Sequence, residues 1–281
     1  MEVFEVDKDI VKRLYPRRTE WCHKGDFGKV LVIGGSEKYT GAPALSAMAS
    51  LRSGSDLAII AAPERAADTD ASLSPNLITV PFKGAFLKEK DFTEIIKLVD
   101  KVDAVLIGPG LGTEQETMNL VSSLLKAIDK PCIVDADGLK AVKGKKLGKN
   151  FVITPHEGEY YYLTGEKPDV EPNRRLSEVQ ECSKKLECTV VLKSHVDVIS
   201  DGEKVAVNET GTPYMTKGGT GDVLSGIILS LLGRKVEIFD AACGGAFISG
   251  AAGEIASQRV GEGLLATDVI DSIPTVVNMK K

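Results

Sequence analysis

Short runs of hydrophobic residues, each ended by glycine or by a polar turn, recur along most of the chain. Their length and continuous hydrophobicity are typical of strands that are buried in a parallel sheet. The runs comprise residues 30–33, 57–61, 104–107, 132–134, 151–153 and 189–192. Between the first two, residues 42–53 are rich in Ala, Leu and Met and are predicted to form a helix that ends at Gly54. Strand, helix and strand in this order form a βαβ crossover, so the pattern predicts an α/β fold.

One segment of the second half predicts antiparallel pairing instead. Asp201-Gly202 lies between two β-rich runs, residues 196–200 and 203–207. Asp-Gly between two such runs is a strong signal for a hairpin. We therefore expect an antiparallel hairpin at the edge of the mostly parallel sheet.

The last third of the chain is predicted to be helical. Residues 223–232 are apolar almost all round, which indicates burial, and residues 241–256 are crowded with Gly and Ala, which permits close packing. No linker or repeat interrupts the pattern. We predict a single domain over residues 25–281, a three-layer sandwich with helices on both faces of the sheet, and an N-terminal arm over residues 1–24.

Composition and charge exclude several classes of protein. The formal net charge of −5 argues against a general nucleic-acid binder, which needs an excess of Lys and Arg. No run of about 18 apolar residues is present to span a membrane, and the acidic N-terminus lacks the features of a signal peptide. Five cysteines without a Cys-x-x-Cys pair predict neither a disulfide framework nor a zinc site. These features favour a cytoplasmic protein.

The motifs that carry chemistry follow the predicted strands. In an open α/β sheet, ligands bind beyond the carboxyl ends of the strands, so these motifs are expected to meet in one crevice. The most informative is Gly218-Gly-Thr-Gly-Asp222, which opens the apolar helix. Its glycines let backbone N–H groups approach an anion at the positive end of a helix. On spacing alone an alternative stays open, in which Thr220 or Asp222 merely caps the helix.

This stretch resembles the anion hole and catalytic base of the ribokinase-like superfamily. Four further stretches narrow the resemblance: Lys24-Gly-Asp-Phe-Gly-Lys-Val-Leu-Val-Ile-Gly-Gly-Ser, Gly41-Ala-Pro, Gly108-Pro-Gly-Leu-Gly, and Asp135-Ala-Asp-Gly-Leu with Thr154-Pro-His-Glu-Gly-Glu. Together they are similar to the nucleotide-dependent NAD(P)H-hydrate dehydratases, which repair hydrated nicotinamide cofactors. The resemblance spans residues 24–275 and implies a ribokinase-like fold.

The resemblance also implies a reaction. A nucleotide phosphorylates the 6-hydroxyl of the (S)-epimer of hydrated NADH or NADPH, and loss of phosphate restores NAD(P)H. Asp222 is then the general base; an ordinary Asp, with a pKa of about 3.9, is ionised at neutral pH. Backbone N–H groups of Gly219, Thr220, Gly221 and Asp222 form the anion hole. The expected cofactors are Mg²⁺ and a phosphoryl donor, ADP or ATP, with ADP favoured by kinship to prokaryotic members.

Binding residues follow from the same resemblance. The hydrated cofactor is expected to contact Ala42, Gly110, Gly112, His156 and Asp222. The nucleotide is expected along Lys193, Ser194, His195, Val196, Asp197 and Gly221, with Ser194 in place of a glycine that the family often has. Glu159 stands where related sugar kinases have a Glu that positions Mg²⁺ through water, and Asp135 and Asp137 either assist it or form a turn.

Each of these residues also has a plain structural interpretation. A lone His156 is more often a satisfied imidazole, and Gly110 and Gly112 fit a tight turn with positive φ. Lys193 at the end of a buried strand is costly unless it meets an anion, which suits a nucleotide phosphate. The basic run of residues 143–149 is interpreted as a solvated face.

The sequence also leads to expectations about partner proteins and about alternative functions. The short segment before Lys24 predicts a stand-alone dehydratase whose epimerase is a separate chain, and the family tends to homotetramers. The alternative within the superfamily is a kinase for a vitamin precursor, which releases a stable phosphorylated product. A nucleotide sensor without catalysis has no need of a base such as Asp222. A Rossmann dehydrogenase is excluded, because no Gly-x-Gly-x-x-Gly follows the first strand.

Overall fold

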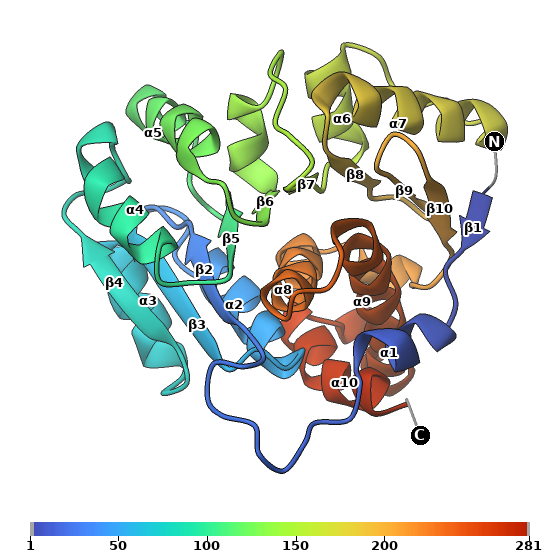
Figure 1. The fold of residues 1–281 in the computed structure, drawn as a ribbon, viewed down its shortest axis with the longest axis horizontal. Coiled ribbons are helices and arrows are strands. Elements are labelled where there is room, and N and C mark those ends of the chain that lie inside the picture. Colours follow the sequence, from blue (N-terminus) through green and yellow to red (C-terminus); the bar gives the residue numbers. More distant parts are fainter. Residues whose placement is uncertain (1–2, 280–281) are drawn as a thin grey trace.

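A single ten-stranded sheet forms the middle layer of the molecule (Figure 1). The computed structural model describes residues 3–279. Along the sheet the strands follow the order β1-β10-β9-β8-β7-β6-β5-β2-β3-β4. They are β1 Val3–Glu5, β2 Lys29–Ile33, β3 Leu57–Pro63, β4 Ile78–Phe82, β5 Ala104–Ile107, β6 Cys132–Val134, β7 Phe151–Ile153, β8 Thr189–Leu192, β9 Asp197–Ser200 and β10 Val205–Asn208. All six parallel strands that the hydrophobic runs predict are present, with bounds that differ by at most two residues.

The predicted hairpin is present, but it is not the edge of the sheet. β9 is antiparallel to both β8 and β10, and the remaining neighbours along the sheet are parallel. β1 pairs with β10 in parallel and takes the edge position. This strand has only three residues, all of them exposed, so it lacks the hydrophobic pattern by which the inner strands are predicted. β4, at the opposite edge, was not predicted either.

Helices cover both faces of the sheet, and the alternation of side chains along each strand separates two cores. In β2, Val30 and Val32 belong to one core, and Leu31 and Ile33 belong to the other. On the first face lie α1 Asp9–Leu14, α2 Ala42–Arg52, α3 Glu64–Leu73, α8 Thr220–Gly233, α9 Ile238–Val260 and α10 Ala266–Asn278. On the second lie α4 Phe92–Val99, α5 Gln115–Ala127, α6 Glu157–Thr164 and α7 Pro172–Leu186. In Figure 1, α5, α6 and α7 lie above the sheet and α8, α9 and α10 below it.

Close helix packing fixes the position of α8, whose first turn bears on function. Every residue of α8 from Val223 to Gly233 is buried. A Cβ atom on Gly226 would collide with the carbonyl oxygen of Ser46 in α2, and one on Gly245 of α9 would collide with the side chain of Ile228. Glycine at these positions lets α2, α8 and α9 approach closely, so α8 is held on two sides.

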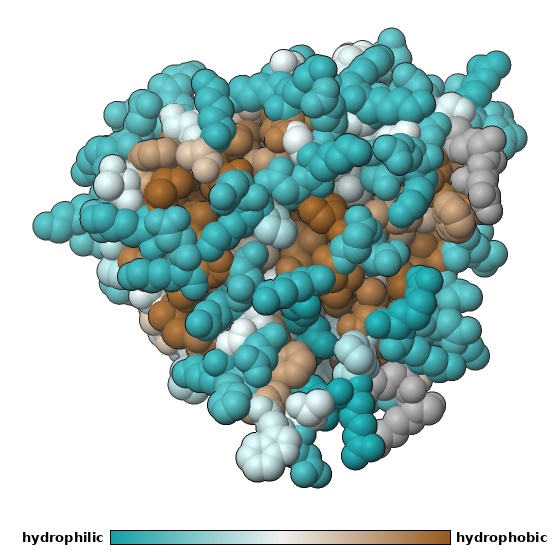
Figure 2. Space-filling model, viewed as in Figure 1, coloured by the Kyte–Doolittle hydropathy of each residue, from teal (hydrophilic) through white to brown (hydrophobic). Residues whose placement is uncertain are grey.

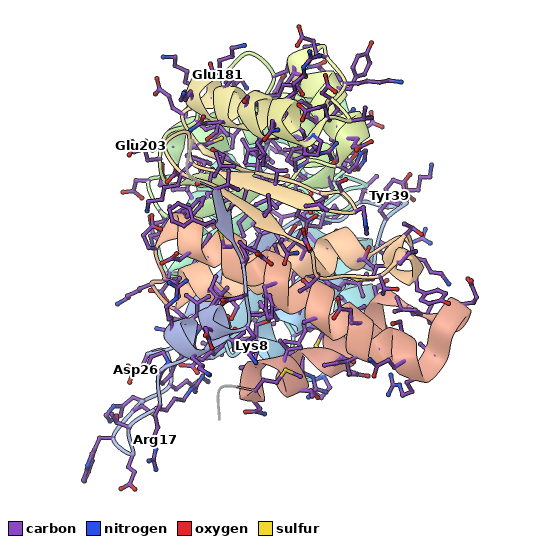
Figure 3. The ribbon with its side chains drawn as sticks, turned by 90° about the vertical axis from the view of Figure 1, so that its right-hand side faces the viewer. Lys8, Arg17, Asp26, Tyr39, Glu181 and Glu203 are labelled. Carbon is purple, nitrogen blue, oxygen red and sulfur yellow. The ribbon has the colours of Figure 1, made fainter. Side chains whose placement is uncertain are left out.

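The N-terminal segment contributes to the fold beyond β1. Ile10, Val11, Leu14 and Tyr15 are buried in the core of the first face. Residues 16–24 that follow are exposed, and Figure 3 shows the loop that carries Arg17 and Asp26 projecting from the body of the molecule. The segment that we expected to be an arm therefore supplies a strand, a helix and this loop.

Hydrophilic side chains form most of the outer surface in the view of Figure 2, and hydrophobic ones show mainly in recesses between them. Among residues 3–279, no helix combines the length and the apolar character that a membrane span requires. All five cysteines are free thiols, and only Cys22 among them is exposed.

Candidate active site

Loops that follow five neighbouring strands meet at one edge of the sheet. The amide of Gly35, after β2, donates to the carbonyl of Pro109 after β5, at 2.8 Å. The amide of Gly112 donates to Asp137 Oδ2, after β6, at 2.9 Å. On the other side of β7, the amide of Lys193 donates to the carbonyl of Pro155 at 2.9 Å. The strand-end motifs therefore form one continuous rim, as expected for an open α/β sheet.

The first turn of α8 presents free backbone N–H groups to this rim. Gly219 is the N-cap residue with a φ of 95°, and no side chain caps the helix. The hydroxyl of Thr220 donates instead to the carbonyls of Met215 and Lys217. Within residues 3–279 the N–H groups of residues 219–222 have no hydrogen-bond acceptor. These donors, at the positive end of a helix, are suited to an anion, and the alternative in which Thr220 or Asp222 caps the helix does not hold.

Glycine is required at the start of this turn for two reasons. A φ of 95° is unfavourable for residues with a side chain, and a Cβ atom on Gly219 would lie 2.7 Å from Leu45 Cδ1 and 2.9 Å from Ala266 Cβ. Gly221 is free of such crowding except for Lys193, whose Nζ would lie 3.3 Å from an added Cβ. The lysine ammonium is therefore beside the anion-binding turn.

Asp222 is half-buried in the first turn of α8. Its carboxylate makes no hydrogen bond or ion pair with the residues that the structure describes. Burial raises its pKa to about 7, the negative charge of Asp135 adds to the rise, and the charge of Lys193 opposes it. The pKa is therefore not the ordinary value near 3.9 that we expected from the sequence, because the burial of Asp222 depends on the fold. A carboxylate with a pKa near neutrality is well matched to general base catalysis.

The positive charge of Lys193 is paired with carboxylates of the protein itself. Its Nζ lies 3.0 Å from Asp135 Oδ1 and 3.8 Å from Glu159 Oε2. Burial by itself lowers the pKa of Lys193, but the two carboxylates outweigh burial and raise it. Asp135, which is 1% exposed, also accepts a hydrogen bond from the hydroxyl of Ser225 in α8. The ends of β6, β7 and β8 are thereby joined to the first turns of α8 by one charged network.

His156 and Glu159 have a structural role in α6. His156 is the N-cap residue, and its Nδ1 accepts from the amides of Gly158 at 2.9 Å and Glu159 at 3.2 Å. In return, Glu159 Oε2 accepts from the amide of His156 at 2.8 Å. Because Nδ1 is an acceptor, the neutral imidazole carries its proton on Nε2, which lies 3.6 Å from Glu159 Oε1, and the side chain as a whole is exposed. Contact of His156 with a substrate stays a prediction.

Ala42, Gly110 and Gly112 lie together on the opposite part of the rim. A Cβ atom on Gly110 would lie 3.2 Å from Ala42 Cβ and 3.0 Å from Tyr39 Cβ. A Cβ atom on Gly112 would have nothing within 4 Å, so the backbone there borders open space. Both glycines have positive φ, 66° and 76°, as a tight turn requires. Gly110 and Gly112 therefore form a tight turn, and the backbone at Gly112 also leaves room for a ligand.

A pocket of about 760 Å³ lies between the β8–β9 loop, the segment after β10 and the helices α8 and α9. It gathers most of the residues that we expected along a nucleotide, namely Lys193, Ser194, His195, Asp197 and Gly221; Val196 does not line it. His156, which we expected to contact the hydrated cofactor, and Thr220, which we expected in the anion hole, also line it. The other lining residues were not predicted: Glu157, residues 210–213, residues 215–217, Leu224, Ala246, Ser249 and Gly250. Glu157 lies in the stretch Thr154-Pro-His-Glu-Gly-Glu, whereas the others lie outside the motifs, so no sequence signal indicates them.

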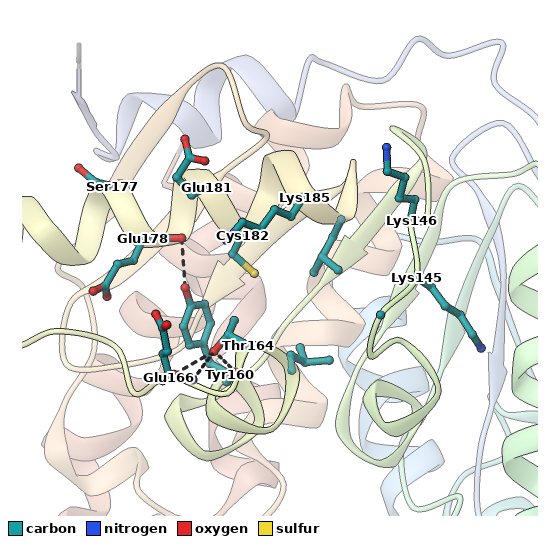
Figure 4. A pocket seen from close by; sticks show the side chains of 13 residues that line it. Lys145, Lys146, Tyr160, Thr164, Glu166, Ser177, Glu178, Glu181, Cys182 and Lys185 are labelled. Carbon is teal, nitrogen blue, oxygen red and sulfur yellow. Dashed lines mark hydrogen bonds between the residues drawn. The ribbon is translucent and has the colours of Figure 1, made fainter.

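A second hollow of about 600 Å³ lies between α6 and α7 (Figure 4). Tyr160 crosses it and donates from its hydroxyl to the carbonyl of Glu178 at 3.1 Å. None of the candidate catalytic or binding residues lines this hollow. The chemistry is therefore assigned to the rim and the larger pocket.

Comparison with known proteins identifies the family of this chain. The family model for NAD(P)H-hydrate dehydratase matches residues 30–275. The ADP-dependent (S)-NAD(P)H-hydrate dehydratase of Nitrosopumilus maritimus is 38% identical over 272 residues, which cover 95% of this chain and 94% of that protein. The bifunctional NAD(P)H-hydrate repair enzyme of Pyrobaculum aerophilum is 43% identical over 265 residues, which cover 94% of this chain but 53% of that protein. The chain thus spans about half the length of such bifunctional relatives.

Solved structures give the same assignment. The crystal structure of ADP/ATP-dependent NAD(P)H-hydrate dehydratase from Bacillus subtilis, co-crystallised with ATP/Mg²⁺, matches with a TM-score of 0.85 and 28% identity and covers 100% of both chains. A ribokinase-like superfamily protein from Enterococcus faecalis matches with a TM-score of 0.87 and 24% identity over 99% of this chain and 96% of that one, which supports the fold alone. From its sequence and its fold together, the chain belongs to the NAD(P)H-hydrate dehydratase family.

Proposed function

We propose that this chain dehydrates the (S)-epimer of hydrated NADH or NADPH at the expense of an adenine nucleotide. The observation that carries the proposal is the first turn of α8. There, backbone N–H groups that have no acceptor in the described part of the chain stand beside Asp222, whose carboxylate has no hydrogen-bond or ion-pair partner among the same residues and whose pKa is about 7. Phosphoryl transfer needs this combination of an anion site and a base.

In the first step Asp222 accepts the proton of the 6-hydroxyl group. The hydroxyl oxygen attacks the terminal phosphorus of the nucleotide, a new oxygen–phosphorus bond forms, and the bond to the leaving phosphate oxygen breaks. The N–H groups of residues 219–222 stabilise the charge on the phosphoryl group as it moves. Lys193, beside Gly221, adds a positive charge to the same place.

In the second step phosphate leaves with the former hydroxyl oxygen. The carbon–oxygen bond at C6 breaks, a proton is lost from the neighbouring carbon, and the ring double bond of NAD(P)H is restored. Hydroxide is a poor leaving group and phosphate a good one, which is why the reaction consumes a nucleotide. The carboxylate of Asp135, close to Lys193, helps to keep the site polar and ordered during this exchange.

The nucleotide is assigned to the pocket of about 760 Å³, which is large enough for a ligand of that size. Lys193 and Gly221 at its inner end point to the position of the phosphates. We favour ADP as the donor and AMP as the product. Two archaeal relatives, 36% and 38% identical to the chain along nearly its whole length, are named ADP-dependent enzymes.

Mg²⁺ fits the donor chemistry of the rim. Within residues 3–279, no cluster of three or more His, Cys, Asp or Glu side chains is arranged to hold a metal ion. Mg²⁺ does not need one, because it binds through one or two carboxylates together with phosphates and waters. Glu159, with Asp135 nearby across Lys193, supplies such carboxylates. When bound, the ion neutralises charge on the phosphates.

The proposal extends to three further expectations. A homotetramer, a cytoplasmic location and a separate epimerase chain stay predictions. A kinase for a vitamin precursor is the alternative within the fold. A hydroxyethylthiazole kinase from Pyrococcus horikoshii matches with a TM-score of 0.60 but only 17% identity, which supports the fold and not its activity.

The proposal is tested by incubating hydrated NADPH with the protein, Mg²⁺ and either ADP or ATP. The near-ultraviolet absorbance of the dihydronicotinamide ring is expected to rise with ADP, in step with the formation of AMP and phosphate. A faster rise with ATP would assign ATP as the donor. No rise with either nucleotide, while nucleotide binding is intact, would overturn the activity.

A further inference from the structure

Arg175, near the start of α7, is a buried cation behind the proposed nucleotide site. Its side chain is only 13% exposed, and its Nη1 lies 3.0 Å from Glu157 Oε1. Its Nη2 is buried and has no hydrogen-bond partner among residues 3–279. A guanidinium group is expensive to bury with part of its donors unused, so its position calls for an explanation in terms of function.

Two functional loops line the nucleotide pocket, and Arg175 contacts one of them directly. Glu157, its partner, is the first residue of α6 and lines the nucleotide pocket; it follows His156 directly. Asp197, at the start of β9, lines the same pocket and accepts a hydrogen bond from the amide of Ser194 at 3.0 Å.

The charge of Arg175 acts on Asp197 as well. Burial raises the pKa of Asp197, whereas its hydrogen bonds to Ser194 and Asn208 and the charges of Lys193 and Arg175 lower it. Burial has the largest effect, so the pKa of Asp197 is raised overall, and the charge of Arg175 opposes burial with the smallest of these contributions.

α6 is tied to α7 at two points that differ in their distance from the site. At the far point, Tyr160 donates to the carbonyl of Glu178 across the hollow of Figure 4. At the near point, Arg175 holds Glu157 at the entrance to the pocket. The near contact reinforces a direct connection between the turn that carries His156 and Glu159 and the loop that carries Lys193, in which the amide of Lys193 donates to the carbonyl of Pro155 at 2.9 Å and its Nζ lies 3.8 Å from Glu159 Oε2.

We propose that Arg175 is a positioning residue that holds the turn of residues 156–159 at the nucleotide pocket. Its ion pair with Glu157 fixes this turn, which is in turn bonded directly to the loop of residues 193–197. This inference rests on the proposed function, in which the first segment contacts the hydrated cofactor and the second the nucleotide. Removing Arg175 is expected to misplace both ligands, and small misplacements are costly in a preorganised site.

The test compares Arg175→Ala with Arg174→Ala. Arg174 is the adjacent residue of the same helix, but its side chain is 75% exposed and its contact, Asp169 at 3.6 Å, lies outside the pocket. We expect Arg175→Ala to raise the KM for both the nucleotide and the hydrated cofactor about tenfold or more. Arg174→Ala is expected to leave both constants unchanged, and Arg175→Lys, which keeps the charge, to restore part of the loss.

Two further variants distinguish a positioning role of Arg175 from a merely structural one. Tyr160→Phe removes the far tether between α6 and α7 and is expected to lower the thermal stability without a change in KM. Glu157→Ala is expected to reproduce the effect of Arg175→Ala, and the double variant to be no worse than either single one, because both remove the same contact. Equal effects of Arg175→Ala and Tyr160→Phe on KM, or additive losses in the double variant, would overturn the proposal.

Calorimetric titration with ADP tests the role of Arg175 without a measurement of turnover. Weaker ADP binding by Arg175→Ala than by Arg174→Ala supports the positioning role even if hydrated NADPH proves not to be the substrate. Unchanged ADP affinity together with unchanged KM values would overturn it, whatever the outcome for the proposed activity.

Discussion

Substituting Asp222 by Asn separates catalysis from structure at the centre of the site. Asn keeps the shape of the side chain but cannot accept the 6-hydroxyl proton. Loss of a positioned base costs about 10²- to 10⁴-fold, so turnover of hydrated NADPH is expected to fall at least about 100-fold. Nucleotide binding is expected to persist, because the N–H groups of residues 219–222 belong to the backbone.

The same substitution is expected to stabilise the protein, and the burial of Asp222 determines the size of the gain in the free energy of unfolding. Burial raises the pKa of Asp222 from 3.8 to about 7. At about 1.36 kcal/mol for each pH unit, ionising Asp222 in the folded protein costs at most about 4 kcal/mol. Partial exposure to solvent reduces this to roughly 1 to 3 kcal/mol.

The sign of the pH dependence of stability follows from the direction in which the pKa of Asp222 is shifted. Because the folded protein holds the proton more tightly than the unfolded chain, the contribution of Asp222 to stability is lost as pH rises from about 4 to about 7. Asn does not titrate. The advantage of Asp222→Asn in the midpoint of thermal unfolding is therefore expected to be small at about pH 4 and largest above about pH 7.

Turnover and thermal unfolding of the two proteins at several pH values check both expectations together. Near-wild-type turnover of Asp222→Asn, with the helix content intact by circular dichroism, would refute the role of Asp222 as the base. Lower stability of the variant at alkaline pH would refute the claim that Asp222 is a half-buried carboxylate whose charge is unpaired among residues 3–279.

Three further variants or conditions probe the rest of the site. Gly221→Val places a branched side chain against Lys193 and in the path of the phosphoryl group, so activity is expected to vanish while the fold survives by circular dichroism; normal turnover would make this turn structural only. Lys193→Ala is expected to raise the nucleotide KM more than it lowers kcat, and unchanged affinity in calorimetric titration would move the phosphate site away from β8. In the wild type, kcat/KM is expected to fall below about pH 7 as Asp222 is protonated, and a pH–rate profile with its acidic limb near about pH 4 would contradict the raised pKa.

The sequence predicted the fold where side chains are buried. The strands β2 and β5 to β8 are continuous hydrophobic runs because helices cover both faces of the sheet, and residues 223–232 are apolar all round because α8 is enclosed. β1 escaped prediction because its three residues are exposed and owe their conformation to pairing with β10. A pattern of hydrophobicity cannot reveal a strand that contributes only backbone hydrogen bonds.

The candidate site was predictable as a set of motifs but not in its electrostatics. The carboxyl ends of neighbouring parallel strands must meet, so the rim follows from topology. The pKa of Asp222 and the counter-ion of Lys193 do not, because they depend on Asp135, which is 58 residues from Lys193 in the chain. Arg175 belongs to no sequence motif, and only the structure shows that its side chain is buried beside Glu157.

The central claim is that the hydroxyl group leaves as phosphate, and one labelling experiment tests it most directly. Hydrated NADPH that carries a heavy oxygen isotope in its 6-hydroxyl group is incubated with the protein, Mg²⁺ and ADP, and the released phosphate and water are analysed by mass spectrometry. The account predicts that the label appears in inorganic phosphate, one labelled oxygen for each NADPH restored. Label in water instead, or in a stable phosphorylated nicotinamide product, would contradict it.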